Sequence, residues 1–262
     1  MIQLLLGKRL ILINNKKILC VVTARAGSKG IPKKNIRPLL GKPLFMWSVL
    51  AGLESKYVDK TVVSSNDQEA YEIFHQFNQS NNELYTRSNK LKWIQRPDEL
   101  SGDLSRNEEA LIHAIHWKRD VFKEEYDIII NLQPTSPCRL SGMLDRSIEA
   151  YIEGGYDSLL TATKDTPFIW QKIDGKWIYT VDKNDCCDRK MRQEFQESEF
   201  IWHDCGNIYI VDTKILLDKK CRIGYNPCIF EIEGINNIQI DDEFDFELIE
   251  KMLKMKKLER PI

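Results

Sequence analysis

The stretch "ILCVVTARAGSKGIPKKN", Ile18 to Asn35, decides the fold class of this 262-residue chain. Its first six residues form an apolar run typical of a buried strand. Two glycines, Gly27 and Gly30, follow in a short loop that also carries a concentration of positive charge. The charged side chains are Arg25, Lys29, Lys33 and Lys34. A loop of this kind after the first buried strand favours an α/β fold with a ligand at the strand's end.

The loop has the residue types that bind a polyphosphate. Glycine lets backbone N–H groups approach an anion closely, and the guanidinium of Arg25 offers a planar fork to phosphate oxygens. The pattern is neither a Walker A loop nor G-x-G-x-x-G. Such a loop could instead be a basic turn exposed to solvent. The position of this loop directly after a buried strand favours the interpretation that it binds an anion.

Short apolar runs alternate with helical patterns outward from this loop. Strands are predicted over residues 18–23, 61–64, 127–132, 158–163, 207–211, 229–232 and 238–240. Helices are predicted over residues 43–54, 68–79, 107–117, 142–153 and 243–257. The expected caps are Asp67 for the second helix, Ser105 or Asn107 for the third, and Asp242 with Asp245 for the last. The inward-facing residues of the last helix, 243–257, are predicted to be Phe244, Leu248, Ile249 and Leu253. This alternation predicts an α/β, mostly parallel, Rossmann-like sheet with helices on both faces.

Two segments depart from the alternation. Residues 1–17 are interpreted as an N-terminal extension before a single domain over 18–262. Residues 164–204 are polar, aromatic and highly charged, so they are predicted to be an insertion that leaves the core sheet.

Composition excludes several classes of protein. The net charge of −1 disfavours a nucleic-acid partner, which usually requires a basic excess. The seven cysteines are scattered and contain no C-x-x-C pair, which argues against a zinc site or a disulfide framework and favours a reducing cytoplasm. No apolar run is long enough to span a bilayer, so no membrane association is expected.

The longer stretch "ARAGSKGIPKKNIRPLLGKPL" resembles the first motif of the acylneuraminate cytidylyltransferase family, which activates nonulosonic acids with CMP. Further motifs of that family recur over most of the chain. The resemblance implies a nucleotidyltransferase sheet in which Arg25 and Lys34 are catalytic and stabilise the leaving pyrophosphate. It also implies that this loop contacts the nucleotide through Ala24, Gly27, Ser28, Lys29 and Asn35.

Two further motifs would contribute to the nucleotide site. The stretch "QRPDELSGD", 95–103, resembles a signature whose arginine, here Arg96, approaches the cytidine. Asn107 stands where the family often has a base-reading serine. The stretch "NLQPTSPCR", 131–139, implies that Gln133 bridges nucleotide and sugar. From the residues alone, Arg-Pro and Gln-Pro could each be a structural turn.

Two stretches resemble the sugar-binding side of the family. "RKMRQEF" resembles the stretch R-P-R-R-Q-D, and "DCGNIYI" resembles the strand E-N-G-S-x-Y. The residues that carry over are Arg189, Arg192, Gln193 and Tyr209. Lys190, Met191 and Cys205 depart from the pattern, and the charged run of the first stretch could instead be a solvated face.

The stretch "IQIDDEFDFE", 238–247, resembles the family's metal-binding segment, in which two acids hold Mg²⁺. Here Asp241 stands at the second acid and Gln239 replaces the first. Mg²⁺ prefers oxygen ligands, so the resemblance implies a Mg²⁺ cofactor held by Asp241 and by the carbonyl oxygen of Gln239, with weaker affinity.

The function implied is transfer of CMP from CTP to the anomeric hydroxyl of an acidic nine-carbon sugar, by a homodimer in which the insertion reaches the partner. Asn107, Trp170 and Cys205 leave open another base or another acceptor, such as Kdo or a phosphonate. Gln239 leaves open an inactive nucleotide-binding homologue.

Overall fold

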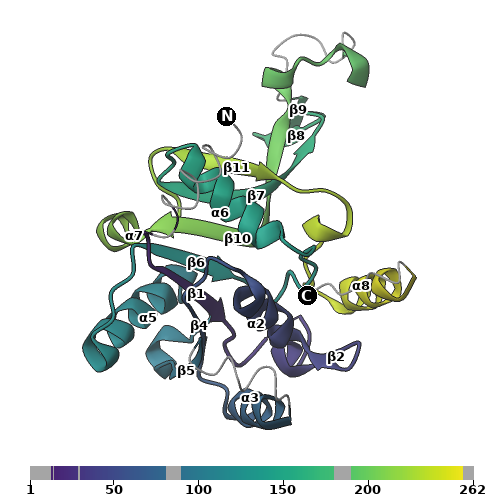
Figure 1. Cartoon of the computed structure of the whole chain (residues 1–262). Helices are drawn as coiled ribbons and strands as arrows, with labels where there is room; N and C mark the ends of the chain where they lie inside the picture. Colours follow the sequence, from purple (N-terminus) through teal and green to yellow (C-terminus); the bar gives the residue numbers. More distant parts are fainter. Residues whose placement is uncertain (1–12, 14, 29, 81–89, 180–189, 256–262) are drawn as a thin grey trace.

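A computed structural model describes residues 13, 15–28, 30–80, 90–179 and 190–255. A seven-stranded sheet forms its centre, in the order β11-β7-β10-β6-β1-β4-β5 (Figure 1). The strands are β1 (Ile18–Thr23), β4 (Lys60–Ser65), β5 (Leu91–Gln95), β6 (Ile128–Leu132), β7 (Ser158–Asp165), β10 (Ile201–Asp212) and β11 (Pro227–Glu231). All neighbours are parallel except β10, which runs antiparallel to β6 and β7. The prediction of a mostly parallel α/β sheet is therefore confirmed.

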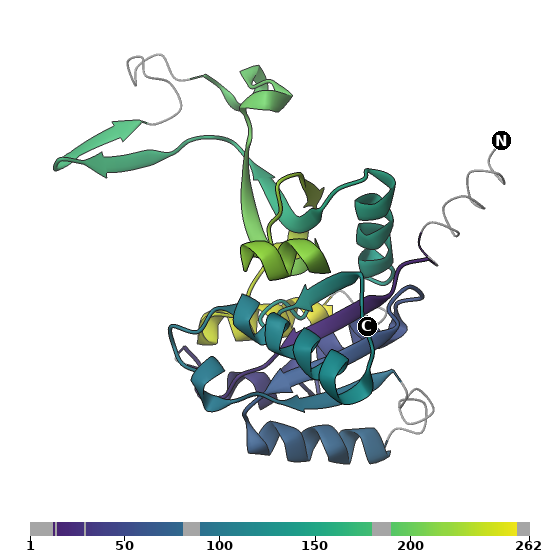
Figure 2. The same ribbon diagram turned by 90° about the vertical axis from the view of Figure 1, so that its left-hand side faces the viewer.

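Helices cover both faces of the sheet, as predicted (Figure 2). The helices α2 (Leu44–Glu54), α3 (Gln68–Ser80) and α6 (Met143–Glu153) contribute to the larger apolar cluster on one face. On the other face, α5 (Asn107–Phe122) and α7 (Thr213–Lys219) pack on Leu19, Val21 and Ile129. The last helix, α8 (Glu243–Met255), buries Phe246, Ile249 and Leu253 against Leu44 and Trp47 of α2. In the described part of the chain, no helix is long and apolar enough to cross a membrane.

Local sequence signals explain how several elements begin. Asp67 caps α3, because its Oδ1 accepts the N–H groups of Glu69 and Ala70 at 3.0 and 3.1 Å. Asp242 and Asp245 cap α8 as expected: Asp242 Oδ1 accepts from the N–H of Asp245, whose Oδ2 accepts from Asp241 and Asp242.

Several local predictions are wrong. Neither expected residue caps α5: the carboxylate of Glu109 instead accepts the N–H of Arg106 at 3.0 Å, so Arg106 is the N-cap. Residues 238–240 are not a strand but follow the 3₁₀ helix Gly234–Asn237, and the N–H of Ile240 is satisfied by the carbonyl of Thr135. Phe244 is exposed, because the 3.6-residue period of α8 turns Phe246 inward instead.

Two strands differ from the prediction. The strand β5 was not predicted, because as an edge strand it has a mixed polar pattern. The strand β10 begins at Ile201 rather than at residue 207, and Ile201–Asp204 pair with the end of β7. These four residues extend past the body of the sheet and are mostly exposed, so they carry no buried apolar run.

The described residues between β7 and β10, 166–179 and 190–200, project from the sheet and are called the arm below (Figure 2). It contains a separate two-stranded sheet of β8 (Trp170–Ile173) and β9 (Lys176–Tyr179). The short 3₁₀ turns Arg192–Glu194 and Glu197–Glu199 follow. Of the predicted extension, Ile13 is buried and belongs to the larger apolar cluster.

Candidate active site

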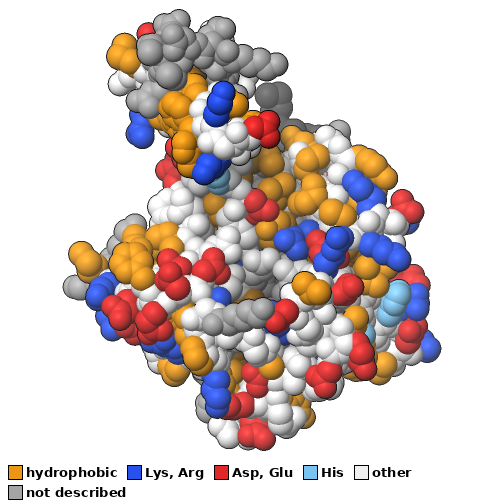
Figure 3. All heavy atoms as spheres, turned by 180° about the vertical axis from the view of Figure 1, so that it is seen from behind, with side chains coloured by type: hydrophobic (Ala, Val, Ile, Leu, Met, Phe, Trp, Pro, Cys, Tyr) orange, Lys and Arg blue, Asp and Glu red, His pale blue; other side chains and the backbone are white. Residues whose placement is uncertain are grey.

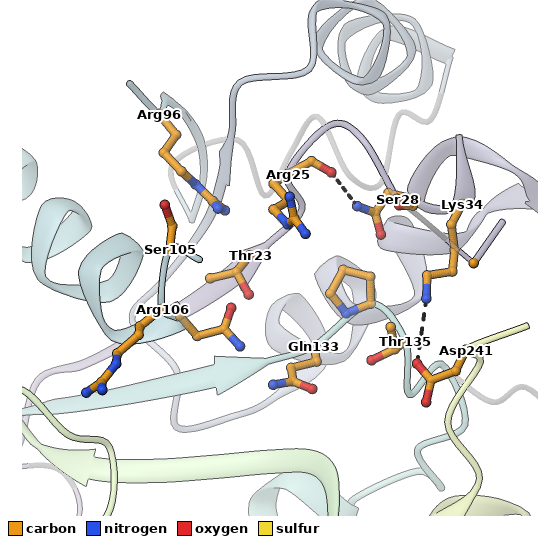
Figure 4. A pocket seen from close by; sticks show the side chains of 14 residues that line it. Thr23, Arg25, Ser28, Lys34, Arg96, Ser105, Arg106, Gln133, Thr135 and Asp241 are labelled. Atoms are coloured by element: carbon orange, nitrogen blue, oxygen red, sulfur yellow. Dashed lines mark hydrogen bonds and ion pairs between the residues drawn. The ribbon is translucent and has the colours of Figure 1, made fainter. Parts of the chain in front are cut away.

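A pocket of about 330 Å³ lies at the carboxyl ends of β1, β5 and β6. In the sheet, β1 lies between β4 and β6. The chain adds β4 and β5 on one side of β1 and then crosses back to add β6 on the other side. The pocket therefore lies at the point where the strand order reverses, which is where open α/β sheets bind ligands. The lining residues are Thr23, Arg25, Ser28, Gly30, Lys34, Asn35, Arg96, Ser105, Arg106, Asn107, Gln133, Pro134, Thr135 and Asp241 (Figure 4). Four of them are cations and one is a carboxylate, so the lining favours an anionic ligand.

The loop after β1 is held by backbone and amide contacts. Ala24 continues the sheet, since its N–H donates to the carbonyl of Ser64 at 3.0 Å. The N–H of Ala26 donates to Asn66 Oδ1 at 2.9 Å. Asn35 Nδ2 donates back across the loop to the carbonyl of Arg25 at 2.9 Å. These contacts fix the loop's curve around the pocket.

The far end of the loop is joined to the segment before α8. A side chain at Gly30 could not fit, because its Cβ would lie 2.0 Å from the carbonyl oxygen of Asp241. Lys34 Nζ donates to the carbonyl of Ile240 at 2.8 Å and lies 3.7 Å from Asp241 Oδ1. The side chain of Lys34 is 12% exposed, whereas that of Asp241 is 75% exposed. The loop after β1 and the acidic segment before α8 therefore form one wall of the pocket.

Arg25 is held on the opposite side of the loop. Its Nη1 donates to the carbonyl of Ser101 at 3.2 Å and to Asp103 Oδ1 at 3.1 Å. Both side chains of the pair are partly exposed. The contact orients the Arg25 guanidinium at the edge of the pocket.

Arg96 is almost wholly buried, with 4% of its surface exposed. Its Nε donates to Ser64 Oγ at 3.1 Å and its Nη2 to the Ser64 carbonyl. Burial, and then the charge of Arg25, lower the pKa of Arg96 to about 10. Among the described residues, no carboxylate pairs with it. A buried guanidinium without a carboxylate partner favours a ligand with electron-rich oxygen atoms.

The first turn of α5 forms the side of the pocket opposite the loop. Asn107 begins the helix, and Arg106 and Ser105 precede it in the lining. Backbone N–H groups at a helix start carry partial positive charge, which adds to the charge of Arg106.

Gln133 lies at the end of β6, and its backbone is anchored by a buried arginine. Arg139, 2% exposed, donates to the carbonyls of Gln133 and Asn207 at 3.0 and 2.7 Å and to Ser48 Oγ at 2.9 Å. Ser48 Oγ also donates to the Gln133 carbonyl at 3.1 Å. The Gln133 backbone is therefore held by Ser48 of α2 and by Arg139, which is itself bound to Asn207 of β10.

The structure brings some predicted residues together and leaves others apart. Arg25, Ser28, Lys34, Asn35, Arg96, Asn107, Gln133 and Asp241 line the pocket. Ala24, Gly27, Tyr209, Gln239, Arg192 and Gln193 do not line it. Lys29 and Arg189 lie outside the described residues.

The predicted residues outside the lining have distinct surroundings. The buried Tyr209 hydroxyl donates to Asp204 at 2.8 Å. Arg192 and Gln193 are exposed on the arm. Gln239 lies near the pocket: a Cβ on Gly206 would be 2.9 Å from its amide atoms and 2.9 Å from Gln133 Oε1.

The donor set fits a Mg²⁺ ion that arrives with a nucleotide. The described residues contain no group of three or more His, Cys, Asp or Glu that could hold a metal alone. Asp241 supplies one exposed carboxylate beside Lys34. Mg²⁺ is commonly bound by one or two carboxylates together with substrate phosphates and water.

Residues missed by sequence reasoning complete the lining. Arg106, Thr23, Ser105 and Thr135 all face the pocket. Thr23 could have been expected, because it is the last residue of a strand that ends at the site. The charge of Arg106 had no local signal, because its position depends on where α5 begins.

With the geometry established, comparison with known proteins assigns the family. A family model described as cytidylyltransferase matches residues 19–204, which is more than half of the chain. The chain belongs to this family. The cytidylyltransferase is thus a CTP-dependent nucleotidyltransferase, and the matched range includes every described lining residue except Asp241.

Three curated relatives are similar to the cytidylyltransferase over most of its length. Post-translational flagellin modification protein B of Campylobacter coli is 24% identical, over 93% of this chain and 97% of the relative. The CMP-N,N'-diacetyllegionaminic acid synthase of Legionella pneumophila is 26% identical, over 92% and 98%. The N-acylneuraminate cytidylyltransferase A of Danio rerio is 25% identical over 90% of this chain, which spans about half, 51%, of that relative.

Solved structures share the fold of the cytidylyltransferase. A CMP:2-keto-3-deoxy-manno-octonic acid synthetase complexed with CTP superposes with a TM-score of 0.63 at 15% identity, covering 92% of this chain and 99% of that one. A 4-diphosphocytidyl-2C-methyl-D-erythritol synthase from Anaerococcus prevotii has a TM-score of 0.63 at 13% identity, covering 93% and 99%.

Proposed function

We propose that the protein transfers CMP from CTP to the anomeric hydroxyl of a nonulosonic acid and releases pyrophosphate. The observation that carries the proposal is the pocket at the end of β1, whose described lining contains four cations, Arg25, Lys34, Arg96 and Arg106, and one carboxylate, Asp241. CTP is strongly anionic and the acceptor is an acid, so both substrates suit this charge. Relatives that act on sugars of this class are similar over nine-tenths of the chain.

The reaction is a substitution at the α-phosphorus of CTP. The acceptor's hydroxyl oxygen forms a bond to this phosphorus and gives up its proton to solvent, while the bond from the phosphorus to the bridging oxygen breaks and pyrophosphate leaves with the charge. Such transfers depend mainly on positioning and charge stabilisation. We assign the second task to Arg25 and Lys34, which lie on the two sides of the loop that would hold the triphosphate.

The remaining pocket residues would bind and orient the substrates. Arg96, Ser105 and Arg106 lie across the pocket from Lys34 (Figure 4), and Asn107 follows them in the chain, so we assign Arg96 and Asn107 to the cytidine, with Arg96 donating to a carbonyl or ribose oxygen. Ser28 and Asn35 would shape the loop around the phosphates. Gln133, between the two ends of the pocket, would contact both nucleotide and sugar.

A Mg²⁺ ion would be held by Asp241 at the phosphate end of the pocket. When bound, Mg²⁺ neutralises phosphate charge and polarises the phosphorus–oxygen bonds. The ion pair between Lys34 and Asp241 keeps the carboxylate at this end of the pocket before the nucleotide arrives.

We propose a homodimer in which the arm of one subunit approaches the sugar end of the partner's pocket. The arm carries exposed apolar side chains on Trp170, Ile173, Trp177, Ile178 and Met191 (Figure 3). Arg192 and Gln193 are exposed on the same arm, so they would be available to the partner's substrate. The expected cytoplasmic location stays a prediction.

Pyrophosphate release is the direct test. The full-length protein would be incubated with Mg²⁺, CTP and one of N-acetylneuraminic acid, N,N'-diacetyllegionaminic acid, pseudaminic acid or Kdo. We expect turnover with a nonulosonic acid and little with Kdo. Turnover with Kdo alone would favour the other acceptor class. CTP binding without any pyrophosphate release would indicate an inactive homologue, and thermal shifts with CTP, UTP, GTP and ATP would test the base preference.

A further inference from the structure

A pair of amide side chains lies beside the nucleotide pocket, over the bulge in β10. The pairing of β10 with β7 shifts register between Asp204 and Tyr209, and Gly206 in this bulge has φ of +60°. A Cβ at Gly206 would lie 2.9 Å from Gln133 Oε1 and 2.9 Å from both amide atoms of Gln239. Glycine therefore leaves open the space that both amides border, although they come from segments about a hundred residues apart.

Three successive side chains in the segment that carries Gln239 have different surroundings. Ile240 is buried in the core, and its backbone is fixed by the N–H bond to the Thr135 carbonyl and by Lys34 on its own carbonyl. Asp241 lines the phosphate end of the pocket beside Lys34. Gln239 does not line that pocket and lies against Gly206, near Gln133.

Gln239 thus borders Gly206 beside Gln133, whereas Asp241 lines the pocket beside Lys34. We infer that Gln239 is a specificity-determining residue whose amide contacts the acid acceptor, together with Gln133, and does not ligate Mg²⁺. The inference rests on the proposed function, because it assumes an acidic sugar at the end of the pocket that Gln133 reaches.

The chemistry of the amide supports this assignment. A glutamine amide can donate as well as accept a hydrogen bond, whereas an ionised carboxylate only accepts. An acceptor that carries its own carboxylate would be repelled by a second one at this position. A neutral donor over Gly206 therefore suits an anionic acceptor.

The test compares Gln239→Glu, which keeps the shape of the side chain but removes the donor and adds a charge, with Gln239→Ala. Steady-state kinetics would use CTP, Mg²⁺ and whichever of the four acids the wild type turns over. We expect KM for the acid to rise roughly tenfold or more in Gln239→Glu and less in Gln239→Ala. We expect KM for CTP to stay within about twofold. Gln76→Glu, on the exposed face of α3, is the matched control and should change neither constant.

A binding measurement provides a readout independent of activity. Calorimetric titration of Mg²⁺ and CTP into each folded variant should give the wild-type affinity for Gln239→Ala and Gln239→Glu, and a weaker one for Asp241→Asn. A change in Mg²⁺·CTP affinity with an unchanged KM for the acid would overturn the inference and make Gln239 a metal ligand. An unchanged KM with unchanged metal affinity would overturn it as well. If the wild type turns over none of the acids, the proposed function fails and the inference fails with it.

Discussion

Two buried arginines illustrate how single residues act in this site. Arg96 and Arg139 both have a pKa lowered to about 10, chiefly by burial, and among the described residues neither has a carboxylate partner. Arg139 is surrounded by the carbonyls of Gln133 and Asn207 and the Ser48 hydroxyl, so its donors are largely used within the protein. Arg96 lines the pocket and lies near Arg25, so its charge is better placed to meet a ligand.

His113 gives a pH-dependent prediction at the same scale. Burial, and then the charges of Arg96 and His116, lower its pKa from the usual 6.5. Because the pKa is lower in the folded state, the stability that neutral His113 contributes is present above pH 6.5 and is lost as the pH falls through its folded pKa. Denaturant unfolding between pH 5 and 7.5 should therefore show a steeper loss of stability on acidification in the wild type than in His113→Gln. Parallel profiles would contradict this prediction.

Asp241 gives a metal-dependent prediction. Its carboxylate is the one acid in the described pocket lining. Asp241→Asn removes that charge and should raise the Mg²⁺ concentration needed for half-maximal rate by about tenfold. Chelation of Mg²⁺ with EDTA should abolish turnover in the wild type. The matched control is Asp242→Asn, which removes a neighbouring charge but keeps a side-chain oxygen to cap α8, so it should leave the Mg²⁺ dependence unchanged. Equal Mg²⁺ dependence in both variants would argue against Asp241 as a ligand.

At the scale of elements, the pocket depends on how loops dock onto one another. The loop after β1 packs against the segment before α8 through Gly30 and Lys34, and against the loop before α5 through Arg25. The bulge in β10 brings Gly206 to the side of Gln133. Each of these contacts joins the end of one element to the end of another, so the site is shaped at element boundaries.

Gly30→Ala tests this docking. The added Cβ would meet the Asp241 carbonyl oxygen at 2.0 Å, and because that atom is backbone the loop must shift. We expect a loss of about 1–3 kcal/mol in the free energy of unfolding, as for other overpacked sites, and a raised KM for CTP. The matched control is Gly102→Ala, whose Cβ would be 3.6 Å from Ser105 Oγ and should be tolerated. A wild-type KM for CTP in Gly30→Ala would show that the docking is not needed for nucleotide binding.

At the scale of the whole molecule, the arm has apolar side chains whose exposure is not explained by the fold of a single subunit. It projects from the sheet and exposes tryptophan and isoleucine side chains that a compact protein would normally bury (Figures 2 and 3). Exposed apolar patches of this kind commonly mark interaction surfaces.

The proposed homodimer gives a prediction at this scale. Analytical ultracentrifugation should show a dimer for the wild type and a larger monomer fraction for Trp177→Glu, because a charge would be placed in the interface. The matched control is Val121→Glu, an exposed apolar residue near the end of α5, which should leave the dimer intact. If Trp177→Glu stays dimeric and fully active, the arm is not the interface.

The fold was predictable from sequence to the extent that its signals are local. Buried strands such as β1 and β6 show as apolar runs, and Asp67 and Asp242 mark helix starts through hydrogen bonds to residues two or three positions away. Edge strand β5 and the start of β10 escaped prediction, because partly exposed strands lack that apolar pattern.

The sequence by itself determined the alternating α/β class and the position of a basic, glycine-containing loop directly after β1. Tertiary structure alone decided that Asp103 holds Arg25, that Lys34 reaches Ile240 and that Gln239 lies with Gln133 over Gly206. The physical reason is the separation along the chain. Arg25 and Asp103 are 78 residues apart and Lys34 and Ile240 are 206 residues apart, so only the packing of the whole sheet and its loops brings such partners within hydrogen-bonding distance.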